Sequence, residues 1–226
     1  MGMRITSLQP QANNPERTSV FVDGRFLMGV STLIVLKMGL RINQVLSPAQ
    51  VQQLEQEEAL QKAVDRGMNF LSFRPRSREE VRRYLRRKET PAELIDTVLE
   101  RLDQLDLIND ESFASFWIES RERFRPKGAQ AIKSELKMKG VKKEVIDEVV
   151  SDDQDEELAL RAGRKKAQSL LRQPDMDHNT FRTRLGPFLQ RRGFSYEVTK
   201  HAVQHLWDEL QGEAGDDDDG DDLFDE

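Results

Sequence analysis

The chain repeats itself at a shift of 51 residues, and this repeat limits the possible folds more than any other feature of the sequence. Comparing residues 73–99 with residues 124–150, without a gap, gives nine identical positions in 27. Both stretches begin with Phe-Arg-Pro, at Phe73 and Phe124. A fainter third copy follows at a further shift of 53 residues and pairs Gly140 with Gly193. A period near 50 residues predicts stacked copies of one supersecondary unit.

Each copy is predicted to be a trio of helices. In the first copy we expect the three helices at about residues 56–72, 78–88 and 91–105. Ser77 and Thr90 are expected to cap the second and third helices, because a glutamate stands three residues after each of them. Pro75 and Pro126 cannot continue a helix, so they mark the turn between the first and second helices.

The N-terminal residues have a different pattern. The segment VFVDGRF, residues 20–26, places β-formers on both sides of Asp23-Gly24, a dipeptide favoured in two-residue hairpin turns. Residues 4–8 can add a third strand, and a short helix is predicted between Ser31 and Gly39. We therefore expect a small β-rich cap, which must pack on a neighbour because an isolated hairpin is only marginally stable.

Together these patterns predict a mainly α fold, with three tandem three-helix repeats in an elongated array behind a small cap that contains a β-hairpin. The helical part is predicted to begin at Ser47, which can form a capping box with Gln50. The expected segments are a cap at 1–46, repeats at 47–108, 109–153 and 154–211, and a disordered acidic tail at 212–226. In such an array each repeat contacts mostly its neighbours.

The formal net charge of −6 is unevenly distributed along the chain. Residues 213–226 hold nine acidic residues and no basic one, and the remainder holds 32 acidic residues against 35 basic ones. The tail has little apolar surface to bury, so it is not expected to fold. It can act as a solubilising tail or as an internal competitor that lies on the basic helices, and its Leu223-Phe224 pair can instead dock on a partner.

Composition and motifs argue against several classes of protein. The chain has no cysteine, which excludes disulfides and thiolate zinc sites, and it has no apolar run of membrane-spanning length, so we expect a cytoplasmic protein. His201 and His205 stand four residues apart, but two ligands do not close a zinc site, so we expect no metal and no cofactor. No phosphate-binding loop or nucleophile motif is present, which argues against an enzyme. The absence of coiled-coil heptads favours a monomer.

Basic residues concentrate on helices of all three repeats, and we predict that they form one binding surface on equivalent helices. Such a surface suits an acidic protein face or a phosphate backbone. The candidate contact residues are Arg74, Arg76, Arg82, Arg83, Arg86, Arg87, Lys88, Arg121, Arg123, Arg125, Lys127, Lys133, Lys137, Lys139, Arg161, Arg164, Lys165, Lys166, Arg184, Arg191 and Arg192.

Five stretches of the sequence carry a resemblance to a known family. They read VFVDGRF, LSPAQ, FLSFRPRSREEVRRYL, PAELIDTVLERLDQLDLINDESFA and KGAQAIKSELKMKGV. In this order they resemble the RecX family, bacterial regulators of the RecA recombinase. The resemblance covers about residues 3–210, is most specific at residues 70–150, and leaves the acidic tail outside the family pattern.

The resemblance implies tandem three-helix units and a regulator with no catalytic centre of its own. Members of the family bind the RecA filament on single-stranded DNA, lie in its helical groove, and dampen ATP hydrolysis, strand exchange and coprotease activity. Some also bind DNA weakly. This implies a role in DNA repair, homologous recombination and the SOS response.

Two other functions stay open on the residues alone. The first is a helical nucleic-acid-binding protein that acts directly on DNA without RecA, because basic three-helix units also suit DNA. The second is an interaction scaffold that uses the acidic tail as a docking peptide.

Overall fold

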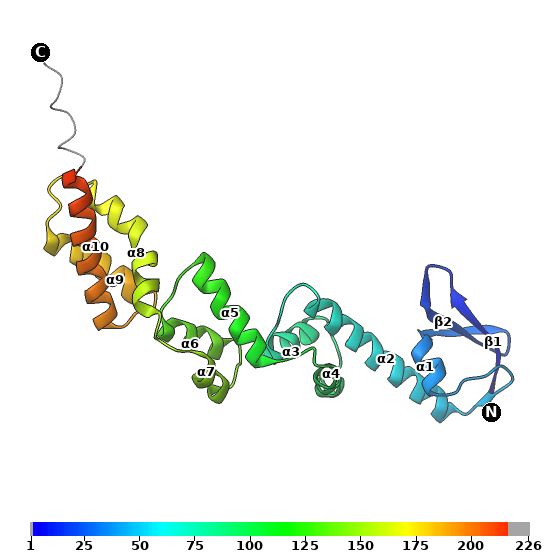
Figure 1. Ribbon diagram of the computed structural model, residues 1–226. Helices are drawn as coiled ribbons and strands as arrows, with labels where there is room; N and C mark the ends of the chain where they lie inside the picture. The colour runs from blue at the N-terminus through cyan, green and yellow to red at the C-terminus, as the bar shows by residue number, and fades with distance from the viewer. Residues whose placement is uncertain (1, 217–226) are drawn as a thin grey trace, which may run out of the picture. The chain divides into compact units, whose positions relative to one another are not determined.

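The computed structural model describes residues 2–216, which form two compact units. Unit 1 runs to Arg74 and includes Val81–Ile108, and unit 2 comprises Pro75–Glu80 and the chain from Asn109 onward. A small sheet opens the chain and helices follow it (Figure 1). None of the helices described is both long and apolar enough to cross a membrane.

The N-terminal cap is a four-stranded antiparallel sheet with a short helix. Its strands are β1 (Met3–Gln11), β2 (Asn14–Val22), β3 (Arg25–Ser31) and β4 (Val45–Leu46), in the order β3-β2-β1-β4. Asp23 and Gly24 have φ angles of 48° and 77°, which confirms the predicted hairpin turn. Helix α1 (Thr32–Lys37) is capped by Ser31 as expected, whereas β4 was not predicted.

Helix α2 (Pro48–Leu71) begins eight residues earlier than expected for the first helix of repeat 1. Ser47 and Gln50 form the predicted capping box. The first half of α2 packs on the sheet, where Leu54 joins the buried cluster of the cap. Glu58, also buried, accepts hydrogen bonds from Arg17 at 2.6 Å and from the Ser31 N–H at 2.9 Å. The cap and repeat 1 therefore share one helix and belong to one compact unit.

Repeat 1 is completed by α3 (Arg78–Arg87) and α4 (Ala92–Gln104), which match the predicted helices closely. Its buried cluster includes Val81, Leu85, Val98, Leu99 and Leu102. The apolar side chains of α4 recur every three or four residues, so one stripe of the helix faces this core.

The two predicted caps in repeat 1 have different outcomes. Ser77 Oγ accepts a hydrogen bond from the Glu80 N–H at 3.1 Å, which confirms its cap. The predicted cap at Thr90 is wrong, because no side chain caps α4. Thr90 turns inward instead, with 6% of its surface exposed, and its hydroxyl has no hydrogen-bond partner among the described residues.

Repeats 2 and 3 lie in unit 2 and have the predicted three helices each. Repeat 2 consists of α5 (Asp110–Phe124), α6 (Ala129–Met138) and α7 (Lys143–Val149). Repeat 3 consists of α8 (Asp155–Leu171), α9 (His178–Gln190) and α10 (Tyr196–Asp216). Each repeat has its own buried cluster, around Phe113 and Leu136 in repeat 2 and around Phe181 and Leu206 in repeat 3.

Two helix boundaries of repeat 3 can be compared with the sequence. Asp177 caps α9 by accepting a hydrogen bond from the Thr180 N–H at 2.7 Å, which holds the pKa of that carboxyl below its usual value. Helix α10 continues to Asp216, five residues past its expected end. Most of the predicted acidic tail, residues 217–226, lies outside the described residues.

Candidate functional site

Repeat 2 contacts the start of α3 through hydrogen bonds that we name the first junction, and all of its residues belong to unit 2. The buried Ser77 donates its hydroxyl to the carbonyl oxygen of Lys139 at 2.6 Å. The backbone N–H of Arg78 donates to Asp110 Oδ1 at 2.8 Å. The Lys139 ammonium, in turn, pairs with Glu80 at 2.7 Å.

Repeats 2 and 3 meet in the same way, at what we name the second junction. The Gly128 N–H donates to the carbonyl oxygen of Arg192 at 3.0 Å. The Ala129 N–H donates to both carboxylate oxygens of Asp155, at 3.0 and 3.2 Å. Ala129 stands 51 residues after Arg78, and Arg192 stands 53 residues after Lys139, so the periods seen in the sequence recur as one contact.

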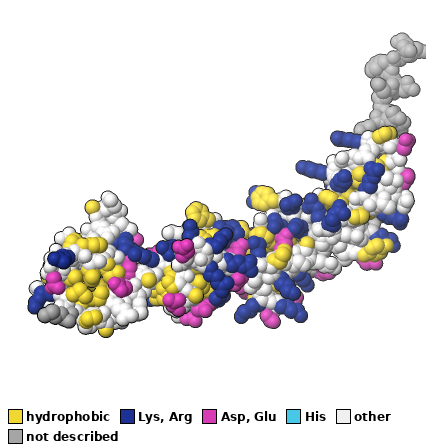
Figure 2. Space-filling model, turned by 180° about the vertical axis from the view of Figure 1, so that it is seen from behind, with side chains coloured by type: hydrophobic (Ala, Val, Ile, Leu, Met, Phe, Trp, Pro, Cys, Tyr) yellow, Lys and Arg dark blue, Asp and Glu magenta, His cyan; other side chains and the backbone are white. Residues whose placement is uncertain are grey.

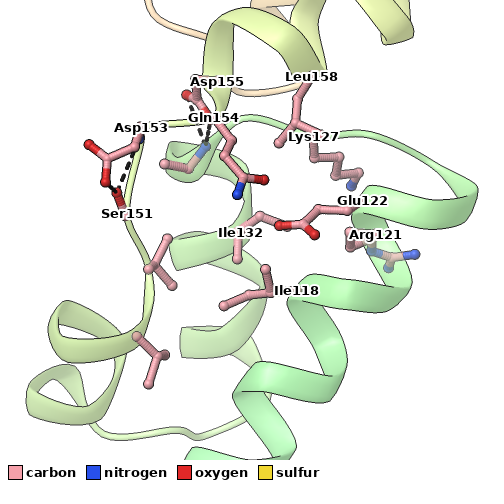
Figure 3. A pocket seen from close by; sticks show the side chains of 13 residues that line it. Ile118, Arg121, Glu122, Lys127, Ile132, Ser151, Asp153, Gln154, Asp155 and Leu158 are labelled. Atoms are coloured by element: carbon pink, nitrogen blue, oxygen red, sulfur yellow. Dashed lines mark hydrogen bonds between the residues drawn. The ribbon is translucent and has the colours of Figure 1, made fainter.

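Asp155 is buried at the second junction, with 4% of its surface exposed. Burial raises the pKa of Asp155 to about 6, against the opposing effect of the Ala129 N–H, and the nearby Asp152 carboxylate raises it further. Asp155 lines a cavity of about 190 Å³, and Figure 3 shows Leu158 and Lys127 next to each other across that cavity. The cavity is part of the contact between two repeats, and its walls are both apolar and charged.

Several candidate contact residues hold repeat 2 together. Glu135 accepts hydrogen bonds from Trp117 Nε1 and Arg121 Nε, both at 2.8 Å, and from Lys127 Nζ. Partial burial raises the pKa of Glu135, but the hydrogen bonds from Lys127, Arg121 and Trp117 outweigh it and lower the pKa overall. Arg121 also stacks on the Trp117 ring at 4.3 Å, so its positive charge is largely compensated inside the repeat.

Other candidate residues are also partly used within their own unit. Arg82 pairs with Asp96 at 2.7 Å, and Arg164 forms two hydrogen bonds with Glu209, at 2.9 and 3.0 Å. Arg192 donates to the Pro126 carbonyl at 3.2 Å, and burial together with the nearby Arg125 charge lowers its pKa. Arg74 and Arg76 are half-buried.

The remaining candidates form the exposed part of the predicted surface. Lys and Arg side chains cover much of the helical part on the face shown in Figure 2. The exposed candidates are Arg83, Arg86, Arg87, Lys88, Arg123, Arg125, Lys133, Lys137, Arg161, Lys165, Lys166, Arg184 and Arg191. Lys133 and Lys137 lie one turn apart on α6, and the repeat relates them to Arg82 and Arg86 on α3.

The basic candidates of repeat 3 are divided between two helices, with Arg184 on α9. Arg161, Lys165 and Lys166 lie on α8, the first helix of the repeat, and not on its second helix. The positions of α9 that correspond to Lys133 and Lys137 hold Gly186 and Gln190. At these two equivalent positions, repeats 1 and 2 carry a basic pair and repeat 3 does not.

The structure also shows two exposed aromatic residues that were not among the candidates. Phe73 and Phe124, which open the two Phe-Arg-Pro stretches, are 83% and 76% exposed. The repeated Phe-Arg-Pro stretch could have pointed to these two residues. They were not chosen as candidates because a phenylalanine is more often part of a core.

Exposed apolar side chains also gather on the cap. Phe26, Leu33, Leu36, Ile42 and Val45 are each more than half exposed. Hydrophobic side chains accordingly cover much of the N-terminal part in Figure 2. Apolar surface that stays contiguous and exposed commonly marks a contact with another protein.

The histidine pair lacks the surroundings of a metal site. His201 lies 3.5 Å from Glu156, and His205 lies 3.7 Å from Glu209. Among the described residues, no group of three or more side chains is placed to hold a metal ion.

Comparison with known proteins decides the family. Four family profiles match in order: "Regulatory protein RecX N-terminal domain" at residues 3–47, and the first, second and third three-helix domains of RecX at residues 63–102, 109–150 and 152–203. The chain belongs to the RecX family. The four matches coincide with the cap and the three repeats of the structure.

RecX relatives and structures extend this result over most of the chain. The Regulatory protein RecX of Listeria welshimeri is 30% identical over 208 residues, covering 92% of this chain and 77% of the relative. That of Bacillus pumilus is 30% identical over 205 residues, covering 90% of this chain and 78% of the relative.

Two solved RecX structures share the fold. A crystal structure of regulatory protein RecX superposes with a TM-score of 0.76 at 21% identity, covering 89% of this chain and 99% of that one. The structure of RecX from Lactobacillus salivarius gives a TM-score of 0.57 at 26% identity, covering 66% and 97%.

Proposed function

We propose that this RecX family member is a regulator without catalytic activity that binds the RecA filament on single-stranded DNA and dampens its ATP hydrolysis, strand exchange and coprotease activity. The observation that carries the proposal is the recurrence of basic residues at equivalent positions of α3 and α6, among which Arg86, Lys133 and Lys137 are exposed, in a chain with all four RecX segments. The basic surface gives the regulator a means of binding acidic protein faces or DNA phosphates.

The repeated surface explains how weak contacts can add up. One exposed ion pair contributes only about 0–1 kcal/mol, so no individual lysine can hold the chain on a filament. When one repeat is bound, the next repeat meets its neighbouring site at a high effective concentration, and the contacts reinforce each other. Phe73 and Phe124 add an exposed aromatic ring to each basic patch, and buried aromatic side chains often dominate binding energy.

The direct test is a titration of the full chain into RecA filaments on single-stranded DNA while ATP hydrolysis is followed. We expect hydrolysis to fall with added chain and the effect to weaken as salt is raised, because exposed charge contacts are screened. Unchanged hydrolysis at saturating chain concentration contradicts the proposal.

Direct action on DNA is the second candidate, and the exposed rings of Phe73 and Phe124, each followed by an arginine, favour it. Aromatic rings can stack on unpaired bases while arginine binds the phosphates. Fluorescence anisotropy with labelled single-stranded DNA, without RecA and across a salt series, separates the two functions. Binding to bare DNA as tight as binding to the filament supports direct action, whereas much weaker binding supports the RecA proposal.

A further inference from the structure

Repeat 3 has a groove between α9 and α10 where repeats 1 and 2 carry their basic pairs. The groove has a volume of about 400 Å³, and its walls include Arg182, Gly186, Gln190, Tyr196, Thr199 and Lys200. Gly186 and Gln190 occupy the positions that correspond to Lys133 and Lys137. The small and neutral residues of α9 therefore leave a hollow where the other repeats present charge.

Two polar side-chain atoms in the wall of this groove have no hydrogen-bond partner among the described residues. Thr199 is only 4% exposed, and its hydroxyl is buried without a partner. Nε2 of His178 is likewise buried without a partner, while the ring packs edge-on against Trp207 at 5.2 Å. A buried hydroxyl without a hydrogen-bond partner destabilises the folded chain, so a polar ligand that supplies a partner in this groove is favoured.

The backbone of α9 adds an acceptor and free space. Pro187 has no N–H, so it cannot donate the helical hydrogen bond to the Thr183 carbonyl, four residues earlier. A side-chain carbon built on Gly186 would meet only Thr199 Cγ2, at 3.9 Å. Acceptors and a hydroxyl along a hollow suit the main chain of an extended peptide.

The side chains of the groove indicate what kind of peptide fits. Arg182 and Lys200 are exposed and basic, whereas Pro187 and Tyr196 provide exposed apolar surface. A peptide that combines carboxylates with large apolar side chains complements both features. The last six residues of this chain, Asp-Asp-Leu-Phe-Asp-Glu at 221–226, have this composition.

We propose that the groove between α9 and α10 binds the chain's own C-terminal segment, residues 221–226. The length of the segment fits: Val203 and Thr199 lie about 20–26 Å back along α10 from Asp216, at 1.5 Å per residue. Leu223 is seven residues beyond Asp216, and seven extended residues span about 23–25 Å. Because the segment is tethered, its effective concentration is in the millimolar range, so weak contacts suffice.

Binding of this segment has a consequence for repeat 3. The acidic residues lie next to Arg182 and Lys200 and neutralise the positive charge at this end of unit 2. Repeat 3 then presents α8, with Lys165 and Lys166, as its basic surface. The inference needs neither RecA nor DNA, so it stands or falls independently of the proposed function.

The test uses the full chain, which has no cysteine, with Glu226→Cys carrying a nitroxide label. Amide signals are compared by NMR with the label oxidised and reduced. We expect the signals of Gly186 and Thr199 to lose at least half of their intensity, and those of the exposed face of α8 around Lys165 to lose much less. Leu223→Ser together with Phe224→Ser should abolish this selective loss without touching the folded repeats.

Matched changes in the groove complete the experiment. Thr199→Val keeps the shape of the side chain and removes a hydroxyl that has no internal partner, so it should reduce the selective loss at least twofold. Lys200→Glu should do the same, whereas the identical charge change Lys165→Glu on α8 should not. The proposal is overturned if the label causes no loss of amide signal intensity in the groove, or an equal loss over all basic surfaces. It is also overturned if the Leu223 and Phe224 changes leave the loss of intensity unchanged.

Discussion

Asp155 makes the stability of the second junction depend on pH. Its pKa is raised to about 6 in the folded chain, so the folded state holds a proton that the unfolded state has already released. The stability contribution of the protonated group is therefore present at low pH and is lost as the pH rises from about 4 to about 6. Above pH 6 the buried carboxylate is charged in both states.

Asp155→Asn should consequently become the more stable form as the pH rises. The amide oxygen can still accept the Ala129 N–H, and no charge is buried. The free energy of unfolding of the variant, minus that of the wild type, should grow by about 1–3 kcal/mol between pH 4 and pH 6.5 and then stay constant. Denaturant unfolding followed by tryptophan fluorescence measures this in unit 2, which contains both tryptophans. A difference that does not vary with pH contradicts the account.

Gly128 gives a second test of the same junction. A side-chain carbon on Gly128 would collide with the carbonyl oxygen of Gly193, which itself has a φ of +88°. Because backbone atoms cannot move aside cheaply, Gly128→Ala should cost about 1–3 kcal/mol of unit 2 stability in the same assay. Gly212→Ala on α10 is the matched control, because its new side-chain carbon has no atom within 4 Å. This change should stabilise unit 2 by up to about 1 kcal/mol, since alanine favours a helix over glycine. Equal effects at the two positions contradict the close packing.

Residues that act through local contacts could be predicted from the sequence, and residues that act through distant ones could not. Ser47 and Ser77 cap helices through neighbours three residues away, and both predictions are confirmed. Lys139 pairs with Glu80, 59 residues earlier, and a basic run gives no indication of such a partner. Thr90 failed as a cap because tertiary packing turned its side chain inward.

At the scale of elements, the repeat in the sequence predicted the helices because the apolar positions and turn residues are copied along with it. The shift of 51 residues located α3 and α6, and the Asp-Gly turn located β2 and β3. The capping box at Ser47 predicted the start of the helical part, but the first helix of repeat 1 was expected only from residue 56, so the continuity of α2 from the cap into repeat 1 was not predicted. The first half of α2 is stabilised by packing on the sheet, which only the folded chain provides.

The distinction between paired and exposed basic residues leads to a prediction about elements. Lys139 pairs with Glu80, lies 4.1 Å from the Trp117 ring, and is only partly exposed. Lys139→Glu should therefore lower the stability of unit 2 by about 1–3 kcal/mol in denaturant unfolding. Lys133→Glu with Lys137→Glu, on the exposed face of α6, should change it by less than about 0.5 kcal/mol per site. A larger loss from the exposed pair contradicts the assignment of roles.

At the scale of the whole molecule, the repeat in the sequence agrees with the repeats of the fold and with the family. The proposed binding surface depends, in addition, on which basic residues remain exposed. The sequence predicted 21 candidate contacts, and the structure commits Arg121, Lys127, Lys139, Arg164 and Arg192 to contacts inside unit 2. We propose that exposed residues of α3 and α6, such as Arg86, Lys133 and Lys137, contact the partner. Charge composition alone could not separate the two groups, because both consist of the same residue types.

The most direct test of this account is the rate of ATP hydrolysis by RecA filaments on single-stranded DNA as three forms of the full chain are added. These are the wild type, Lys133→Glu/Lys137→Glu on α6, and the control Lys142→Glu/Lys143→Glu, an exposed pair at the start of α7. We predict that the wild type inhibits hydrolysis and that the control reaches half-maximal inhibition within about threefold of the wild-type concentration. The α6 variant should need a concentration at least roughly tenfold higher for half-maximal inhibition, which is equivalent to about 1.4 kcal/mol. Equal inhibition by all three forms, or none by the wild type, contradicts it.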